Sequence, residues 1–95
     1  MSIKETDKKF VANTYKRFPV EIVRGKGSLV YDEKGKEYID MTSGIGVSAF
    51  GVCDDVWQEA ITAQLNTLSH MSNLYYTEPC ARLAELLCDM GNAAV

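Results

Sequence analysis

Apolar and polar residues alternate through the first half of the chain, which is typical of strands in a sheet with one covered face. The apolar positions of this alternation include Val20, Ile22, Leu29 and Tyr31. The Gly-Lys-Gly segment 25–27 is expected to separate the first two strands. Residues 32–36 carry a turn signal with Gly35 placed for a positive φ, and residues 37–41 form the return strand. The pattern predicts a three-stranded antiparallel meander.

The second half of the chain changes to helical spacing. Asp55 is expected to cap a first helix, with Gln58 as its reciprocal partner in a capping box. The apolar face of this helix is formed by Trp57, Ala60, Ile61, Gln64, Leu65 and Leu68. Thr77 is the expected N-cap of a second helix, with Pro79 in its first turn and Gly91 at its end. Its apolar face is formed by Cys80, Leu83, Leu86, Leu87 and Met90.

These elements define an α+β arrangement: a three-stranded antiparallel meander followed by two amphipathic helices. The polar residues 4–14 are expected to form a frayed helix or an arm that ends before Pro19. A chain of 95 residues is at most one small domain. Its apolar faces exceed what a domain of that size covers by itself. We therefore expect a lobe of a larger protein.

Composition and charge narrow the class of partner. The formal net charge is −3, and the longest basic run is Lys8-Lys9, which argues against nucleic acid and against an anionic membrane surface. The polar start MSIKETDKKF has no apolar core of a signal peptide, so a cytoplasmic location is expected. Three cysteines, at 53, 80 and 88, indicate neither a disulfide framework nor a zinc site. They are expected to be buried or half-buried thiols.

The residues with reactive side chains are not spaced as a known catalytic site requires. The single histidine, His70, is expected at a helix end, and no spacing supports a triad with Cys53 or Ser43 and Asp54. No lysine lies in the desolvated or cation-neighboured setting that a Schiff base requires. The glycine loop at 43–47 lacks the third glycine of a dinucleotide site. It is either a loop that only turns the chain or one that brings backbone amides and Ile45 against a small ligand.

Three blocks of residues, taken in their order and spacing, indicate a protein family. The first is Asn13-Thr14-Tyr15 with Phe18-Pro19-Val20. The second is Arg24-Gly25-Lys26-Gly27, then Asp32, Gly35, Tyr38 and Asp40, then Ser43-Gly44-Ile45-Gly46-Val47. The third is His70, Ser72-Asn73-Leu74-Tyr75-Tyr76 and Glu78-Pro79, followed by the segment 83–87. Together they resemble the N-terminal part of the class III (fold type I) pyridoxal-phosphate aminotransferases. Their details favour the branch that takes acetylornithine or succinylornithine over those that take ornithine or 4-aminobutyrate.

The resemblance implies a homodimeric enzyme that acts on small amino acids and 2-oxo acids with pyridoxal 5'-phosphate. It places the catalytic lysine beyond Val95, so no catalytic residue is expected in this chain, which we expect to be inactive alone. By this resemblance, residues 1–51 are expected to form the N-terminal arm and meander of the small domain, and residues 52–95 the helical segment that leads into the α/β large domain, which we expect to be missing from this chain. The resemblance puts Tyr15, Ser43, Gly44 and Ile45 in the substrate pocket. It puts Ser72, Asn73 and Tyr75 in a loop near the interface and cofactor.

One segment departs from the family pattern. After Gly51 such enzymes usually continue with His, any residue, His and Pro. Here the chain reads Val52-Cys53-Asp54-Asp55. Asp55 is expected to replace the proline as a helix cap, so that the fold survives.

Overall fold

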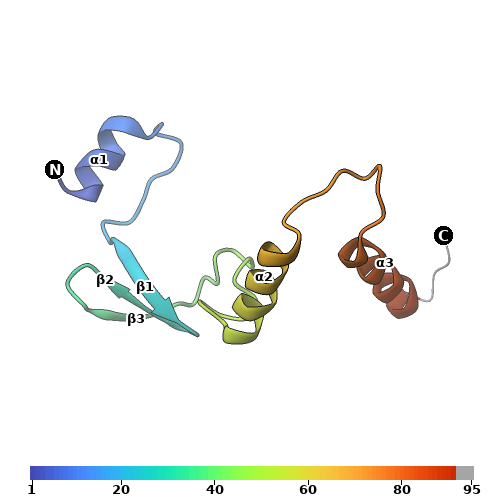
Figure 1. Cartoon of the computed structure of the whole chain (residues 1–95). Helices are drawn as coiled ribbons and strands as arrows, with labels where there is room; N and C mark the ends of the chain where they lie inside the picture. The colour runs from blue at the N-terminus through green and yellow to red at the C-terminus, as the bar shows by residue number, and fades with distance from the viewer. Residues whose placement is uncertain (92–95) are drawn as a thin grey trace. The chain divides into compact units, whose positions relative to one another are not determined.

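The computed structural model describes residues 1–91. It divides into two units, Met1–Ala60 and Ile61 onward, and each is described by itself. The elements are α1 (Ile3–Phe10), β1 (Ile22–Lys26), β2 (Leu29–Asp32), β3 (Glu37–Ile39), α2 (Asp55–Thr67) and α3 (Glu78–Gly91) (Figure 1). Three helices and a three-stranded sheet confirm the α+β class expected from the sequence. No helix in the described part of the chain is long and apolar enough to cross a membrane.

The N-terminal segment, expected as a frayed helix or an arm, begins with the short helix α1. A capping box starts it: the Ser2 amide donates to the Glu5 carboxylate at 2.7 Å, and the Glu5 amide donates to the Ser2 hydroxyl at 3.3 Å. Lys8 and Lys9 lie in the last turn, where positive charge faces the negative end of the helix dipole. The helix ends at Phe10, and the chain then runs without regular structure to β1.

The sheet confirms the predicted antiparallel meander, with strand order β1-β2-β3. Lys26 pairs with Leu29 in the first hairpin, and Val30 pairs with Tyr38 in the second. The register of β1 shifts between Ile22 and Arg24, which is a bulge or irregularity near the start of the strand.

The first turn is shorter than expected. Gly25 and Lys26 belong to β1, so only Gly27 and Ser28 connect the first two strands. Gly25 is required for space: a Cβ there would lie 2.9 Å from Val52 Cγ1 and 3.0 Å from the Leu29 carbonyl oxygen. Gly27 is the residue that takes the turn conformation, with φ +61°. The return strand is also shorter, because β3 ends at Ile39 instead of residue 41.

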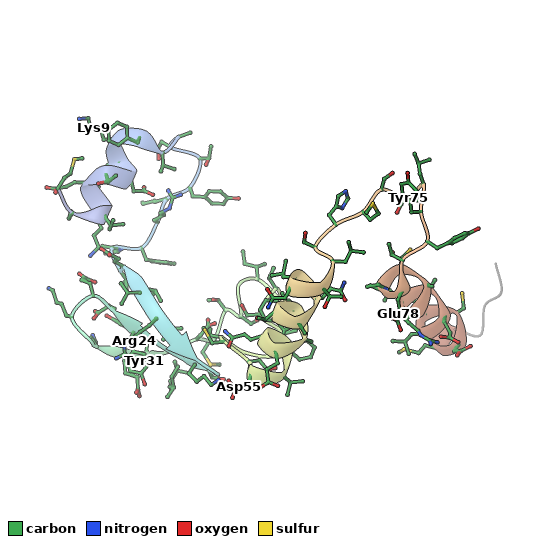
Figure 2. The ribbon with its side chains drawn as sticks, in the orientation of Figure 1. Lys9, Arg24, Tyr31, Asp55, Tyr75 and Glu78 are labelled. Atoms are coloured by element: carbon green, nitrogen blue, oxygen red, sulfur yellow. The ribbon has the colours of Figure 1, made fainter. Side chains whose placement is uncertain are left out.

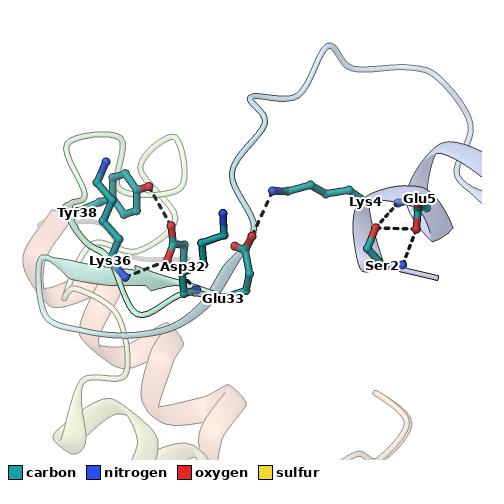
Figure 3. A network of polar contacts seen from close by, with 8 residues as sticks. Ser2, Lys4, Glu5, Asp32, Glu33, Lys36 and Tyr38 are labelled. Atoms are coloured by element: carbon teal, nitrogen blue, oxygen red, sulfur yellow. Dashed lines mark hydrogen bonds and ion pairs between the residues drawn. The ribbon is translucent and has the colours of Figure 1, made fainter.

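The second turn is organised by Asp32, the only buried side chain among residues 1–91. Its carboxylate accepts hydrogen bonds from the amides of Lys34 and Lys36, each at 2.9 Å, and from the Tyr38 hydroxyl at 3.0 Å (Figure 3). Gly35 has φ +80°, which confirms the positive φ expected there. Burial would raise the pKa of Asp32, but these donors outweigh it and lower that pKa below its ordinary value.

Helix α2 confirms the first expected helix but corrects its cap. Asp54, not Asp55, caps it: the Asp54 carboxylate accepts the Trp57 amide at 2.9 Å, and the Asp54 carbonyl accepts the Gln58 amide at 3.0 Å. The capping box expected from Asp55 and Gln58 is therefore wrong. Asp55 is the first residue of the helix, and its carboxylate pairs with Lys26 instead.

Helix α3 confirms the second expected helix. Thr77 precedes it, and the Thr77 carbonyl accepts the Ala81 amide at 3.3 Å. Pro79 lies in the first turn, and Gly91 is the last residue of the helix, both as expected. On the surface of α3, Arg82 pairs with Glu78 at 3.8 Å and with Glu85 at 2.9 Å. Such pairs are neighbours on one helix face and add little stability at this exposure.

No apolar side chain among residues 1–91 is buried, so the described chain has no hydrophobic core. The apolar faces of both long helices are open: Trp57 and Leu65 are more than half exposed on α2, as are Leu83 and Leu86 on α3. The excess of apolar surface expected from the sequence is confirmed. The expectation of buried thiols is wrong for Cys53 and Cys80, which are exposed because no core covers them, while Cys88 is half-buried.

Candidate functional site

The loop between β3 and α2, residues 42–51, has the most strained backbone in the described chain. Four consecutive residues, 43–46, take a positive φ, and two of them are not glycine: Ser43 at 46° and Ile45 at 57°. A β-branched residue in this region is an outlier that costs about 1–3 kcal/mol. The Ile45 side chain is 95% exposed, so no packing within the first unit compensates. Such strain motivates a functional hypothesis for this loop.

Asp40 holds the start of the loop. Its carboxylate accepts hydrogen bonds from the Thr42 hydroxyl at 2.8 Å, the Thr42 amide at 2.9 Å and the Ser43 amide at 3.2 Å. The Thr42 hydroxyl and amide lower the pKa of Asp40 below its ordinary value; burial opposes them, and the Ser43 amide adds to the lowering. Asp40 is therefore ionised at neutral pH. An aspartate carboxylate that accepts the amide two residues on forms an Asx turn, and the aspartate itself is the local sequence signal for it.

The β1–β2 turn holds both ends of the loop. At the start, the Asp40 amide donates to the Ser28 carbonyl at 2.8 Å. At the end, Gly27 and Val52 exchange two backbone hydrogen bonds of 2.8 Å. Gly51 must be glycine here, because it has φ +86° and its Cβ would lie 3.0 Å from the backbone of Gly27. The loop is thus a strained segment with two fixed ends.

Lys26 adds a side-chain contact at the end of the loop. Its ammonium group donates to the Cys53 carbonyl at 2.8 Å and to the Asp55 carboxylate at 2.5 Å. The hydrogen bond to Asp55 raises the pKa of Lys26 above its ordinary value, although partial burial opposes this. Nothing in the sequence pattern indicated this pair, because its two residues are 29 positions apart.

Tyr15 lies in the segment between α1 and β1. It lines a pocket of about 590 Å³ together with residues of α1 and of the segment 16–21, and its side chain is 73% exposed. Ser43, Gly44 and Ile45 do not line this pocket. The structure therefore does not bring Tyr15 into one pocket with the loop, and a shared substrate pocket stays a prediction.

Ser72, Asn73 and Tyr75 belong to the second unit, in the segment between α2 and α3. Tyr75 is labelled in Figure 2. The Tyr75 amide donates to the Ser72 carbonyl at 3.1 Å, and the Leu74 amide donates to the Ser72 hydroxyl at 3.2 Å. These bonds form a tight turn that leaves the Tyr75 side chain 66% exposed. The expected place of this turn near an interface and a cofactor stays a prediction.

The lysines of the described chain do not fit a Schiff base to pyridoxal phosphate. Such a lysine needs a pKa lowered by desolvation or by a neighbouring cation. No lysine among residues 1–91 is buried, and the pKa of Lys26 is shifted upward, in the wrong direction. Within the same residues no group of three or more His, Cys, Asp or Glu side chains is arranged to hold a metal ion.

A family model described as aminotransferase class-III matches residues 10–94. Because this match covers most of the chain, the protein belongs to the class III aminotransferases, and the family expected from the sequence is confirmed.

Individual relatives agree with this assignment. The chain is 51% identical over 85 residues to the acetylornithine aminotransferase of Haemophilus ducreyi, which covers 90% of the chain and 22% of that protein. The crystal structure of acetylornithine aminotransferase from Elizabethkingia anophelis superposes with a TM-score of 0.86 at 26% identity, covering 92% of this chain and 23% of that one. The ornithine aminotransferase of Toxoplasma gondii gives a TM-score of 0.86 at 25% identity, covering 92% and 20%. The chain thus spans about a fifth of the length of these relatives.

Proposed function

We propose that this chain is the N-terminal segment of an acetylornithine aminotransferase. The complete enzyme moves an amino group between N-acetylornithine and 2-oxoglutarate, in arginine biosynthesis, and works as a homodimer in the cytoplasm. The identity of 51% to the Haemophilus ducreyi enzyme supports the substrate. The open apolar faces of α2 and α3 support a segment that the rest of an enzyme covers.

The strained backbone of the loop 42–51 is the observation that supports a role in substrate recognition. Ser43 and Ile45 hold a left-handed backbone, and the Ile45 side chain is almost fully exposed. The loop ends are fixed by the β1–β2 turn and by Asp40. A strained loop on a fixed scaffold is the arrangement that proteins use for recognition. In the proposed function, Ser43, Gly44 and Ile45 wall the pocket for the side chain of the amino donor, and Tyr15 lies beside it.

Pyridoxal 5'-phosphate is the cofactor of the proposed enzyme, where it supplies an electron sink for the carbon that carries the amino group. The residues described here do not fit its covalent attachment, so the attaching lysine belongs to another part of the enzyme. Ser72, Asn73 and Tyr75 are proposed to lie near the cofactor and the subunit interface. The chain by itself is therefore proposed to have no transaminase activity.

Two alternatives remain distinct from this proposal. A different class III substrate, such as succinylornithine, ornithine or 4-aminobutyrate, is compatible with the fold, since the ornithine enzyme of Toxoplasma gondii superposes equally well. The structural comparison does not separate the two substrates, since the ornithine enzyme is 25% identical and the Elizabethkingia anophelis acetylornithine enzyme 26%. The 51% sequence identity to the Haemophilus ducreyi protein favours acetylornithine. A stand-alone interaction lobe without enzymatic activity requires a chain that folds by itself. The absence of any buried apolar side chain in residues 1–91 argues against that.

The test is a hybrid enzyme, in which this chain replaces the segment of Haemophilus ducreyi acetylornithine aminotransferase that aligns with it. The hybrid is expected to transaminate acetylornithine in preference to ornithine, as judged by kcat/KM. The unaltered Haemophilus ducreyi enzyme is the control. A hybrid that is dimeric and loaded with cofactor but inactive on both substrates would contradict the proposal. A preference for ornithine would move the assignment to the alternative substrate.

A further inference from the structure

Lys26 lies at the point where strand β1 meets the end of the strained loop. Its ammonium group bridges two acceptors, the Cys53 carbonyl at 2.8 Å and the Asp55 carboxylate at 2.5 Å. Both acceptors lie within four residues of the end of the loop, and Asp55 is the first residue of α2. A single side chain thus ties the last residue of a strand to the junction between the loop and a helix.

The contact acts on one end of the loop and not on the other. Next to Lys26, the backbone of Gly27 pairs with Val52 through two hydrogen bonds. Gly51, just before Val52, has a left-handed backbone that brings it against Gly27. The start of the loop is held separately by Asp40 and by the Ser28 carbonyl. Loss of the Lys26 contact therefore removes the side-chain tie to Cys53 and Asp55, while the Gly27–Val52 pair and the hydrogen bonds at the start of the loop remain.

We propose that Lys26 is a positioning residue for the loop 42–51, which it orients toward the amino donor by fixing the end of the loop to strand β1. The inference rests on the proposed role of the loop in substrate recognition. Lys26 itself does not touch the substrate. The side chains of Lys26 and Asp55 are 60% and 77% exposed, so solvent and salt screen their attraction and the effect is modest.

Kinetics of the hybrid enzyme test the proposal. Lys26→Met, which keeps the length of the side chain and removes its charge, is expected to raise KM for acetylornithine about threefold to fivefold, with kcat changed less than about twofold. Lys26→Arg keeps the charge, and its KM for acetylornithine is expected to stay close to that of the hybrid with Lys26. In 1 M salt the difference between the hybrid and Lys26→Met is expected to shrink. Lys4→Met is the matched control, because it removes another ion pair of this unit, Lys4–Glu33, which does not contact the loop.

Hydrogen exchange gives a second readout that does not depend on activity. In the hybrid, Lys26→Met is expected to speed amide exchange at the end of the loop and the junction with α2, residues 48–55, with no change in residues 29–43. An unchanged KM together with unchanged exchange overturns the proposal. Equal changes in Lys4→Met, or a parallel loss of kcat and thermal stability, also overturn it, because they show a general structural role. If the hybrid itself is inactive, the proposed function fails, and exchange alone decides whether Lys26 orders the loop.

Discussion

Tyr38 donates a hydrogen bond of 3.0 Å to Asp32, the only buried residue in the described part of the chain. The bond crosses the second hairpin, from β3 to the last residue of β2. It is the third hydrogen bond to the Asp32 carboxylate, after those from the amides of Lys34 and Lys36. A small sheet without a hydrophobic core thus depends on a polar network for the shape of its turn (Figure 3).

Asp32→Asn in the hybrid enzyme is expected to lower Tm by about 2–4 °C, because the amide cannot accept the same charge-assisted hydrogen bonds. Differential scanning calorimetry measures this change. Glu33→Gln is the control: Glu33 is the next carboxylate in the turn, and its only ion pair is with Lys4 at 3.4 Å within the described residues. A Tm change of less than about 1 °C is expected there. Equal effects of the two substitutions would contradict a special role for Asp32.

The pH dependence of this Tm difference follows from the lowered pKa of Asp32. A carboxyl group whose pKa is lower in the folded state contributes stability above its unfolded pKa, about 3.9, and loses it as pH falls through the folded value. The difference between the hybrid and Asp32→Asn is therefore expected to stay constant from pH 8 to about pH 5. A difference that fades between pH 6 and pH 5 would show that the pKa of Asp32 is raised instead.

The loop strain predicts an unusual response to glycine. Ile45→Gly removes a β-branched residue from a left-handed backbone, so it is expected to leave the free energy of unfolding of the hybrid unchanged or to increase it by about 1 kcal/mol. Val47→Gly is the matched control, since Val47 is also exposed and β-branched but has no positive φ. It is expected to destabilise. Urea denaturation distinguishes the two, and a loss of stability in Ile45→Gly as large as in Val47→Gly would remove the strain argument.

The isolated chain is expected to form no specific covalent adduct with pyridoxal phosphate. The reason is that none of its lysines within residues 1–91 is buried, and the pKa of Lys26 is raised. The measurement is borohydride reduction of the mixture followed by peptide mapping. Weak labelling spread over many lysines agrees with the account. Stoichiometric labelling of one lysine would contradict it.

The sequence was sufficient to predict elements whose signals are local. The alternation from Val20 onward, Gly35 in its turn and Gly91 at a helix end all depend on neighbouring residues, and the structure confirms them. Two of the errors involve contacts between residues that are distant in the sequence. Gly25 looked like a turn residue, but its role is to leave room for Val52, 27 positions away. Asp55 looked like a cap, but Lys26 binds it and Asp54 takes the cap.

In the candidate site, too, the features with a local sequence signal were predicted and the others were not. The Ser43–Gly46 segment was predicted as a loop because glycines and small residues mark it. Its left-handed backbone at Ser43 and Ile45 was not predicted, because non-glycine residues rarely adopt it. The roles of Tyr15, Ser72, Asn73 and Tyr75 rest on resemblance, and they stay predictions that no contact within either unit tests.

Substrate choice through Ile45 is the central claim, and Ile45→Tyr in the hybrid enzyme tests it most directly. A tyrosine fills the proposed pocket and adds a hydrogen-bonding group, which shifts discrimination between two substrates by about 1–3 kcal/mol. The ratio of kcat/KM for acetylornithine to that for ornithine is expected to fall about tenfold. An unchanged ratio with full activity would place Ile45 outside the pocket and remove the recognition role of the loop 42–51. An equal loss on both substrates would leave the loop with a packing role only.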